Sequence, residues 1–142
     1  MVKRAKNREA KIGFFSVVHS VYFEQFPCLR EAFEEYHSET IKMIESNDVE
    51  VVDYGLIDSN SRAFKTQERM SGDGLDVIFC NMITYATSSV FAPIIKNESS
   101  PVILVALQPL KALDYNNAST LMQLKNDNIC SVPEFLGVAN RL

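Results

Sequence analysis

The chain has 142 residues, of which 46% are hydrophobic and 23% charged, and its formal net charge is −4. This length fits one domain with a substantial core, and the composition excludes disordered and fibrous proteins. No apolar run approaches the roughly eighteen residues that a membrane span needs, and no apolar secretion-signal segment follows the N-terminus. We therefore expect one α/β domain over residues 1–142, located in the cytoplasm and without a membrane partner.

Basic residues are concentrated at the start of the chain, where only Glu9 opposes them. They are Lys3, Arg4, Lys6, Arg8 and Lys11. Taking these five bases and Glu9 from the 14 basic and 18 acidic residues leaves nine and 17, a net charge of −8 on the rest. That part has no basic stripe, so we expect no nucleic-acid partner. Residues 1–11 are expected to form a flexible, solvated head, with phosphate contact as the alternative.

Hydrophobic periodicity predicts four strands alternating with helices. The expected strands are 12–18, 49–57, 75–81 and 102–107, and the expected helices between them begin near residues 27, 60 and 84. Pro27 suits a first helical turn, and Asp58-Ser59 supplies a cap signal for the second helix. This order implies a three-layer α/β fold with an open parallel sheet of about four to five strands, Rossmann-like or flavodoxin-like.

The last predicted strand ends at a candidate ligand residue, Gln108. The run from Val102 to Leu107 is typical of a strand buried on both faces, and Gln108-Pro109 ends it. Ligands of open parallel sheets bind outside the carboxyl ends of the strands, and the amide of Gln108 can both donate and accept. The alternative is a glutamine that only closes a turn.

Two helices are expected in the last third of the chain. The first spans 114–124 with Ala118, Leu121 and Met122 inward, and the second begins at Pro133 with Ser131 available as its cap. The second helix reaches the last residue without a C-terminal cap, so we expect the natural protein to continue.

The sequence lacks the motifs of the common nucleotide-binding, metal-binding and nucleophilic catalytic sites. The exit from the first strand has no glycine, which disfavours dinucleotide, Walker and flavin-phosphate loops. His37 is expected to face solvent, and Asp53 and Asp58 are expected to be a strand neighbour and a cap, so no metal site is predicted. A Ser-His-Asp arrangement is not excluded by counting, but no Gly-x-Ser-x-Gly elbow anchors one.

The chain has three cysteines, an odd number, and no two of them have the close spacing of a zinc site. This pattern is typical of reduced cysteines in a cytosolic protein. Cys80 lies in a predicted strand and is expected to be inert. Cys130, in a polar loop, is the one candidate for reactivity.

Small polar residues should gather at the carboxyl edge of the sheet. They are Ser16, His19, Asn81, Thr84 and Gln108. A rim of hydrogen-bonding groups of this kind suits a sugar.

At this rim the sequence resembles the N-terminal domain of the L-arabinose isomerase and L-fucose isomerase superfamily. One matching segment runs from Gly13 to Tyr22, where His19 and Tyr22 stand at the family's histidine-and-tyrosine turn. The other contains Gln108, the 126–131 loop and the Glu134-Phe135-Leu136-Gly137 stretch. The middle of the chain matches in element order and around Thr84-Tyr85. Val18 and Cys130-Ser131-Val132 stand where the family often has glutamine and His-Gly-Gly.

The resemblance implies an aldose–ketose isomerase that is normally longer, uses a divalent metal such as manganese and forms a homo-oligomer. The metal ligands and proton-transfer groups of that family lie in later domains, so the resemblance implies no catalytic or metal residue and no bound cofactor in this chain. It implies sugar contacts from Gln108, His19, Tyr22, Thr84 and Glu134, completed by the remaining domains and a neighbouring subunit. For Glu134, stabilisation of a helix N-terminus is an equal alternative.

A second hypothesis is a stand-alone, flavodoxin-like module that binds a small molecule or a partner without catalysis. A compact monomer that binds a sugar or nucleotide unaided would favour it.

Overall fold

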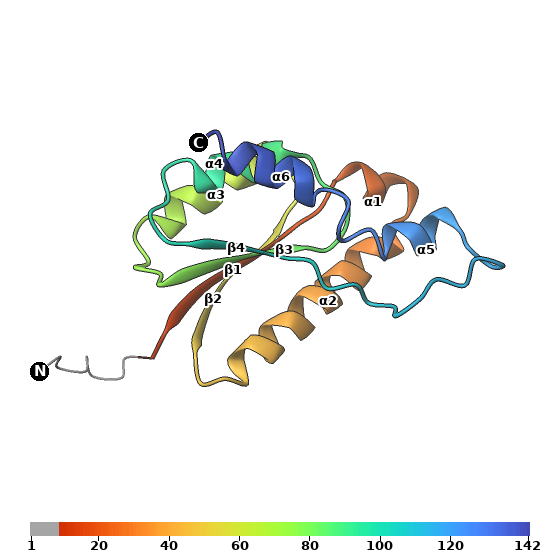
Figure 1. Cartoon of the computed structure of the whole chain (residues 1–142), viewed down its shortest axis with the longest axis horizontal. Helices are drawn as coiled ribbons and strands as arrows, with labels where there is room; N and C mark the ends of the chain where they lie inside the picture. The colour runs from red at the N-terminus through yellow and green to blue at the C-terminus, as the bar shows by residue number, and fades with distance from the viewer. Residues whose placement is uncertain (1–8) are drawn as a thin grey trace, which may run out of the picture.

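The computed structural model describes residues 9–142 and contains a four-stranded, all-parallel sheet between helices (Figure 1). The elements are β1 (Lys11–Val17), α1 (Val21–Gln25), α2 (Cys28–Glu45), β2 (Glu50–Ile57), α3 (Asn60–Met70), β3 (Val77–Met82), the 3-10 turn η1 (Ser88–Val90), α4 (Ala92–Ile95), β4 (Val102–Val105), α5 (Thr120–Leu124) and α6 (Val132–Ala139). The strand order is β2-β1-β3-β4. The predicted α/β fold with an open parallel sheet is confirmed.

Two hydrophobic clusters hold the helices on opposite faces of the sheet (Figure 1). On the face that carries α3, α4 and α6, the rings of Phe91 and Phe135 stack with centroids 4.6 Å apart, and Phe135 is fully buried. On the face that carries α2, Leu29 and Phe33 are fully buried. Burial of these aromatic and aliphatic side chains supplies the main stabilising free energy of the three layers.

β2 contains a bulge that the sequence did not predict. Phe14 pairs with Asp53, but Ser16 pairs with Leu56, so β2 has one more residue than β1 between the two pairs. Gly55 adopts φ +75°, which glycine tolerates because it has no Cβ. The Gly55 amide donates to Oδ1 of Asp53 at 2.6 Å, and this bond fixes the bulge.

β4 corrects the prediction of a doubly buried strand from 102 to 107. It is shorter, it lies at the edge of the sheet, and 46% of the Ile103 surface is exposed. An apolar run does not reveal whether a further strand lies beside it or whether helices cover both of its faces. The expectation that β4 is buried on both faces was therefore wrong. The helix expected after residue 84 is also divided, into η1 and α4.

The last helix does not reach the end of the chain as expected, because α6 ends at Ala139 and Asn140 is its C-cap. The helix expected over 114–124 is reduced to α5, whose N-cap Ser119 accepts a hydrogen bond from the amide of Met122, and Ala118 is exposed rather than inward. Residues 1–8 of the predicted basic head lie outside the described residues, whereas Lys11 begins β1. Among the described residues, no helix has both the length and the apolar composition of a membrane span.

Candidate functional site

Three rings meet at the carboxyl edge of the sheet. His19 follows β1, Tyr22 lies in α1 and Tyr85 follows β3, and all three are partly exposed. The centroid of His19 lies 5.5 Å from that of Tyr22 and 6.4 Å from that of Tyr85. The structure therefore brings together His19 and Tyr22, which the sequence selected, with Tyr85, which it did not select as a site residue.

The loop between α5 and α6 lies close enough to Tyr22 to act on its ionisation. Burial is the largest effect that raises the pKa of Tyr22, and the charges of Asp127, Cys130 and Tyr85 raise it further. The phenol therefore stays protonated at neutral pH and can donate a hydrogen bond as well as accept one. We call His19, Tyr22 and Tyr85, with Asp127 and Cys130 of this loop, the edge cluster.

Hydrogen bonds fasten the last third of the chain to the exit from β3. The buried hydroxyl of Thr84 donates to the carbonyl of Leu124 at 2.7 Å, and Ser131 Oγ accepts from the amide of Ala86 at 2.9 Å. Ser131 was expected to cap α6, but its side chain makes no capping bond because it holds Ala86. These bonds give the edge cluster a defined position relative to β3.

Glu134 links α6 to η1. Its Oε1 accepts a hydrogen bond from the amide of Ser88, the first residue of η1, at 2.7 Å. An acceptor at this position satisfies an amide that lacks a partner within the turn. The structure thus gives both Thr84 and Glu134 a partner within the chain itself.

Gln108 lies apart from the edge cluster, exposed on a groove of about 380 Å³ between α2 and the segment after β4. The groove is lined by Tyr36, Glu39, Thr40, Met43, Leu107, Gln108, Pro109 and Leu110. Burial, and then the charges of Glu35 and Glu39, raise the pKa of Tyr36, so its hydroxyl remains a donor. The groove lining does not include His19 or Tyr22, so the structure does not join Gln108 to them.

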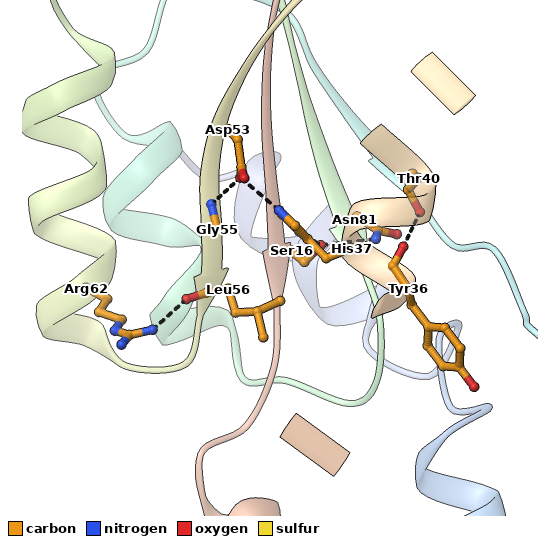
Figure 2. Close-up of polar contacts among 9 residues, drawn as sticks. All are labelled: Ser16, Tyr36, His37, Thr40, Asp53, Gly55, Leu56, Arg62 and Asn81. Atoms are coloured by element: carbon orange, nitrogen blue, oxygen red, sulfur yellow. Dashed lines mark hydrogen bonds and ion pairs between the residues drawn. The ribbon is translucent and has the colours of Figure 1, made fainter. Parts of the chain in front are cut away.

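His37 corrects the prediction of a solvent-facing side chain, because it is only 6% exposed and bonded through both ring nitrogens. Figure 2 shows the His37 side chain reaching from α2 toward β1 and β2: Nδ1 lies 2.7 Å from Ser16 Oγ, and Nε2 lies 2.8 Å from Asp53 Oδ1. Asn81 Nδ2 donates to Ser16 Oγ at 3.1 Å. Asp53 is the strand neighbour that the sequence predicted, since it pairs with Phe14, and its carboxylate also bonds to His37 and Gly55.

One tautomer satisfies this whole chain of polar groups. Since Ser16 Oγ accepts from Asn81, its proton is free to go to Nδ1 of His37, and Nε2–H then donates to the Asp53 carboxylate. With the Nε2–H tautomer, each of the hydrogen-bonded side chains Asn81, Ser16, His37 and Asp53 has a partner. Buried polar groups that are fully paired in this way fix the relative position of the elements that carry them.

Ser16, His37 and Asp53 are hydrogen-bonded in the order of a Ser-His-Asp triad. The exposure of Ser16 and Asp53 is, however, the opposite of what nucleophilic catalysis requires. Ser16 is fully buried, whereas 51% of the Asp53 side chain is exposed. A catalytic triad needs the serine to face substrate and the carboxylate to be shielded. We therefore assign the chain Ser16–His37–Asp53 to the fold, where it ties α2 to β1 and β2.

The pKa values of the Cys130 and Cys80 thiols are both raised, so neither thiol is activated. Burial, followed by Asp127, raises the pKa of Cys130 to about 11, and burial raises the pKa of Cys80 well above its ordinary value. A nucleophilic cysteine needs a depressed pKa. The expectation that Cys80 is inert is supported, and Cys130 lacks the environment of a reactive thiol.

Within residues 9–142, no group of three or more His, Cys, Asp or Glu side chains is placed to hold a metal ion.

No protein-family model matches the chain, and no curated protein sequence matches it significantly.

Proposed function

We propose that this chain is a sugar-contact domain of the L-arabinose and L-fucose isomerase type. The observation that carries the proposal is the convergence of His19, Tyr22 and Tyr85 at the carboxyl edge of a parallel sheet, the usual ligand edge of such folds. The flat rings offer apolar surface to the C–H face of a sugar, and the imidazole and the phenols offer hydrogen bonds to its hydroxyl groups.

The proposed role is binding without catalysis by this chain alone. Aldose–ketose isomerisation needs a base that moves a proton between adjacent carbons and a group that polarises the carbonyl. Among the described residues, no three or more His, Cys, Asp or Glu side chains are grouped so that they could hold a metal ion. In this proposal the metal and the proton transfer belong to other domains of the enzyme, and a neighbouring subunit completes the site. Gln108 is proposed as a further sugar contact from its own groove.

We also propose a cytoplasmic location. Cys28, Cys80 and Cys130 are all free thiols in the structure, as is usual in a reducing compartment.

The proposal is tested by titrating the isotope-labelled chain with L-arabinose and L-fucose and following backbone amide shifts by NMR. We expect saturable shifts at residues 19, 22 and 85, and no ketose product when manganese is added. The absence of any shift at these residues would contradict sugar contact, and product formation would contradict a non-catalytic role. Shifts at this edge with a nucleotide or flavin, and none with sugars, would favour the stand-alone flavodoxin-like module instead.

A further inference from the structure

The edge strand β4 is short and follows Pro101, but it carries no charged side chain. Exposed edges of soluble proteins are usually kept short or carry charged side chains, prolines, bulges or a covering element, because unpaired backbone groups attract other strands. Between Glu98 and Lys111 the sequence has no charged residue. β4 pairs with β3 on one side, and no other described strand pairs with it.

The outward backbone groups of β4 can be assigned from one hydrogen bond. The carbonyl of Pro101 accepts from the amide of Ile78 at 2.9 Å, so Pro101 faces β3. Alternate residues of a strand direct their backbone groups to the same side. Val102 and Leu104 therefore present their N–H and C=O groups to the outside, and Ile103 directs its own toward β3.

Apolar surface continues from this edge onto the face that carries α2. Ile103 pairs with Phe79 and Phe79 pairs with Phe14, so their side chains share that face, and the ring of Phe14 lies 4.9 Å from His37 of α2. α2 thus covers the centre of the sheet, but it leaves Ile103 46% exposed. Leu107, Leu110 and Met43, which line the groove between α2 and the segment after β4, are 49%, 44% and 61% exposed.

We propose that β4 is an interface that pairs antiparallel with β4 of a second copy of this chain. Around a two-fold axis at Ile103, Val102 of each copy lies opposite Leu104 of the other, and these are the residues with outward backbone groups. Each such pair exchanges two hydrogen bonds, so about four form across the axis. No charge on the edge opposes the pairing of two identical strands. This interface goes beyond the proposed function and does not depend on it.

The arrangement also explains the apolar surface. A two-fold axis at this point keeps α2 of both copies on the same face of a continuous eight-stranded sheet. Ile103 then packs against Ile103 of the second copy, and Leu107 and Leu110 extend the contact. A stable interface buries about 800 Å² per partner, more than a four-residue strand supplies, so these side chains are a necessary part of it.

The first test is the mass of the chain in solution, measured by sedimentation over a concentration series. We expect a dimer for the natural sequence and a monomer for Ile103→Lys, which places a charge at the axis. The matched control is Phe64→Lys on α3, where 53% of the phenylalanine is exposed, and it should remain a dimer. Circular dichroism checks that both variants fold. A monomeric natural sequence, or a dimer that survives Ile103→Lys, would overturn the proposal.

The second test locates the axis. In a chain with Cys28→Ala and Cys130→Ala, Ile103→Cys should form an interchain disulfide under mild oxidation, because residues opposed in a non-hydrogen-bonded antiparallel pair have Cα atoms about 4.5 Å apart. Cys80 is fully buried and takes no part. Phe64→Cys in the same background should stay unlinked. Equal cross-linking at both positions, or none at residue 103, would refute this register.

Discussion

The Nδ1 atom of His37 lies 2.7 Å from the hydroxyl of Ser16, and this bond joins the middle of α2 to the centre of the sheet. Ser16 is fully buried and His37 nearly so. The imidazole reaches Asp53 on its other side, so a single side chain connects α2, β1 and β2.

Replacing His37 by alanine should therefore lower the free energy of unfolding by about 2–4 kcal/mol. The change removes two hydrogen bonds, leaves Ser16 without its acceptor and opens a cavity beside Phe14. Urea denaturation measures the effect. His19→Ala is the control, because His19 is partly exposed at the edge of the sheet and should shift stability by only about 0.5 kcal/mol. Equal midpoints for the two variants would mean that the His37 bonds contribute nothing to the fold.

Ser16 should not react with a fluorophosphonate probe of serine nucleophiles. Its hydroxyl is inside the protein, and substrate or probe cannot reach it without separation of α2 from the sheet. Mass spectrometry of the labelled native protein measures the result. Stoichiometric labelling that disappears in Ser16→Ala would show that the Ser16–His37–Asp53 chain is catalytic after all.

Tyr54 should make the alkaline stability of the protein depend on pH. Burial, and then its 2.5 Å hydrogen bond to Asp73, raise the pKa of Tyr54 far above its ordinary value of 10.0. A folded pKa above the unfolded one means that this contribution is complete below pH 10 and is lost as pH rises toward the folded pKa. Tyr54→Phe should cost about 0.5–1.5 kcal/mol at neutral pH and flatten the decline of stability above pH 10. Denaturation at several pH values tests both effects, and an unchanged alkaline slope in the variant would contradict them.

Cys130 should be alkylated slowly and with a steep pH dependence. With a pKa of about 11, only about one thiol in a thousand is ionised at pH 8, and the rate should rise about tenfold per pH unit up to the pKa. Asp127→Asn should increase the rate, because it removes a charge that raises this pKa but keeps the backbone carbonyl that accepts from the thiol. Mass spectrometry of iodoacetamide-treated protein resolves Cys130 from Cys28, which is also exposed. Rapid, pH-independent modification of Cys130 would contradict the assigned environment.

The order of strands and helices was predictable because each element has a local periodicity. Local cap signals helped as well: Ser59, predicted as part of a cap signal, is the observed N-cap of α3 and accepts a hydrogen bond from the amide of Arg62. The exposure of β4 was not predictable, because it depends on what lies beside the strand in space. The bulge at Gly55 was also missed, because Val49–Ile57 reads as an uninterrupted strand.

The proximity of the edge-cluster residues was predicted only for the two that are close in sequence. His19 and Tyr22 both come from the exit of β1, and the structure places their rings together. Tyr85 and Asp127 reach the same cluster from distant parts of the chain, and no pattern in the sequence joins them to it. For His37 a signal did exist: it lies four residues after Phe33 and eight after Leu29, on the buried face of α2.

The central claim, that the edge cluster binds sugar, is tested most directly by comparing sugar affinity in matched tyrosine variants. Tyr22→Phe removes one partly buried hydroxyl from the cluster, whereas Tyr115→Phe removes a hydroxyl from a side chain that is 83% exposed elsewhere on the surface. NMR titration with L-arabinose and L-fucose gives the dissociation constants. We expect Tyr22→Phe to weaken binding about threefold to tenfold, as the loss of one hydrogen bond predicts, and Tyr115→Phe to leave it unchanged. Equal affinities in the two variants, or no sugar binding by the natural sequence, would contradict the account.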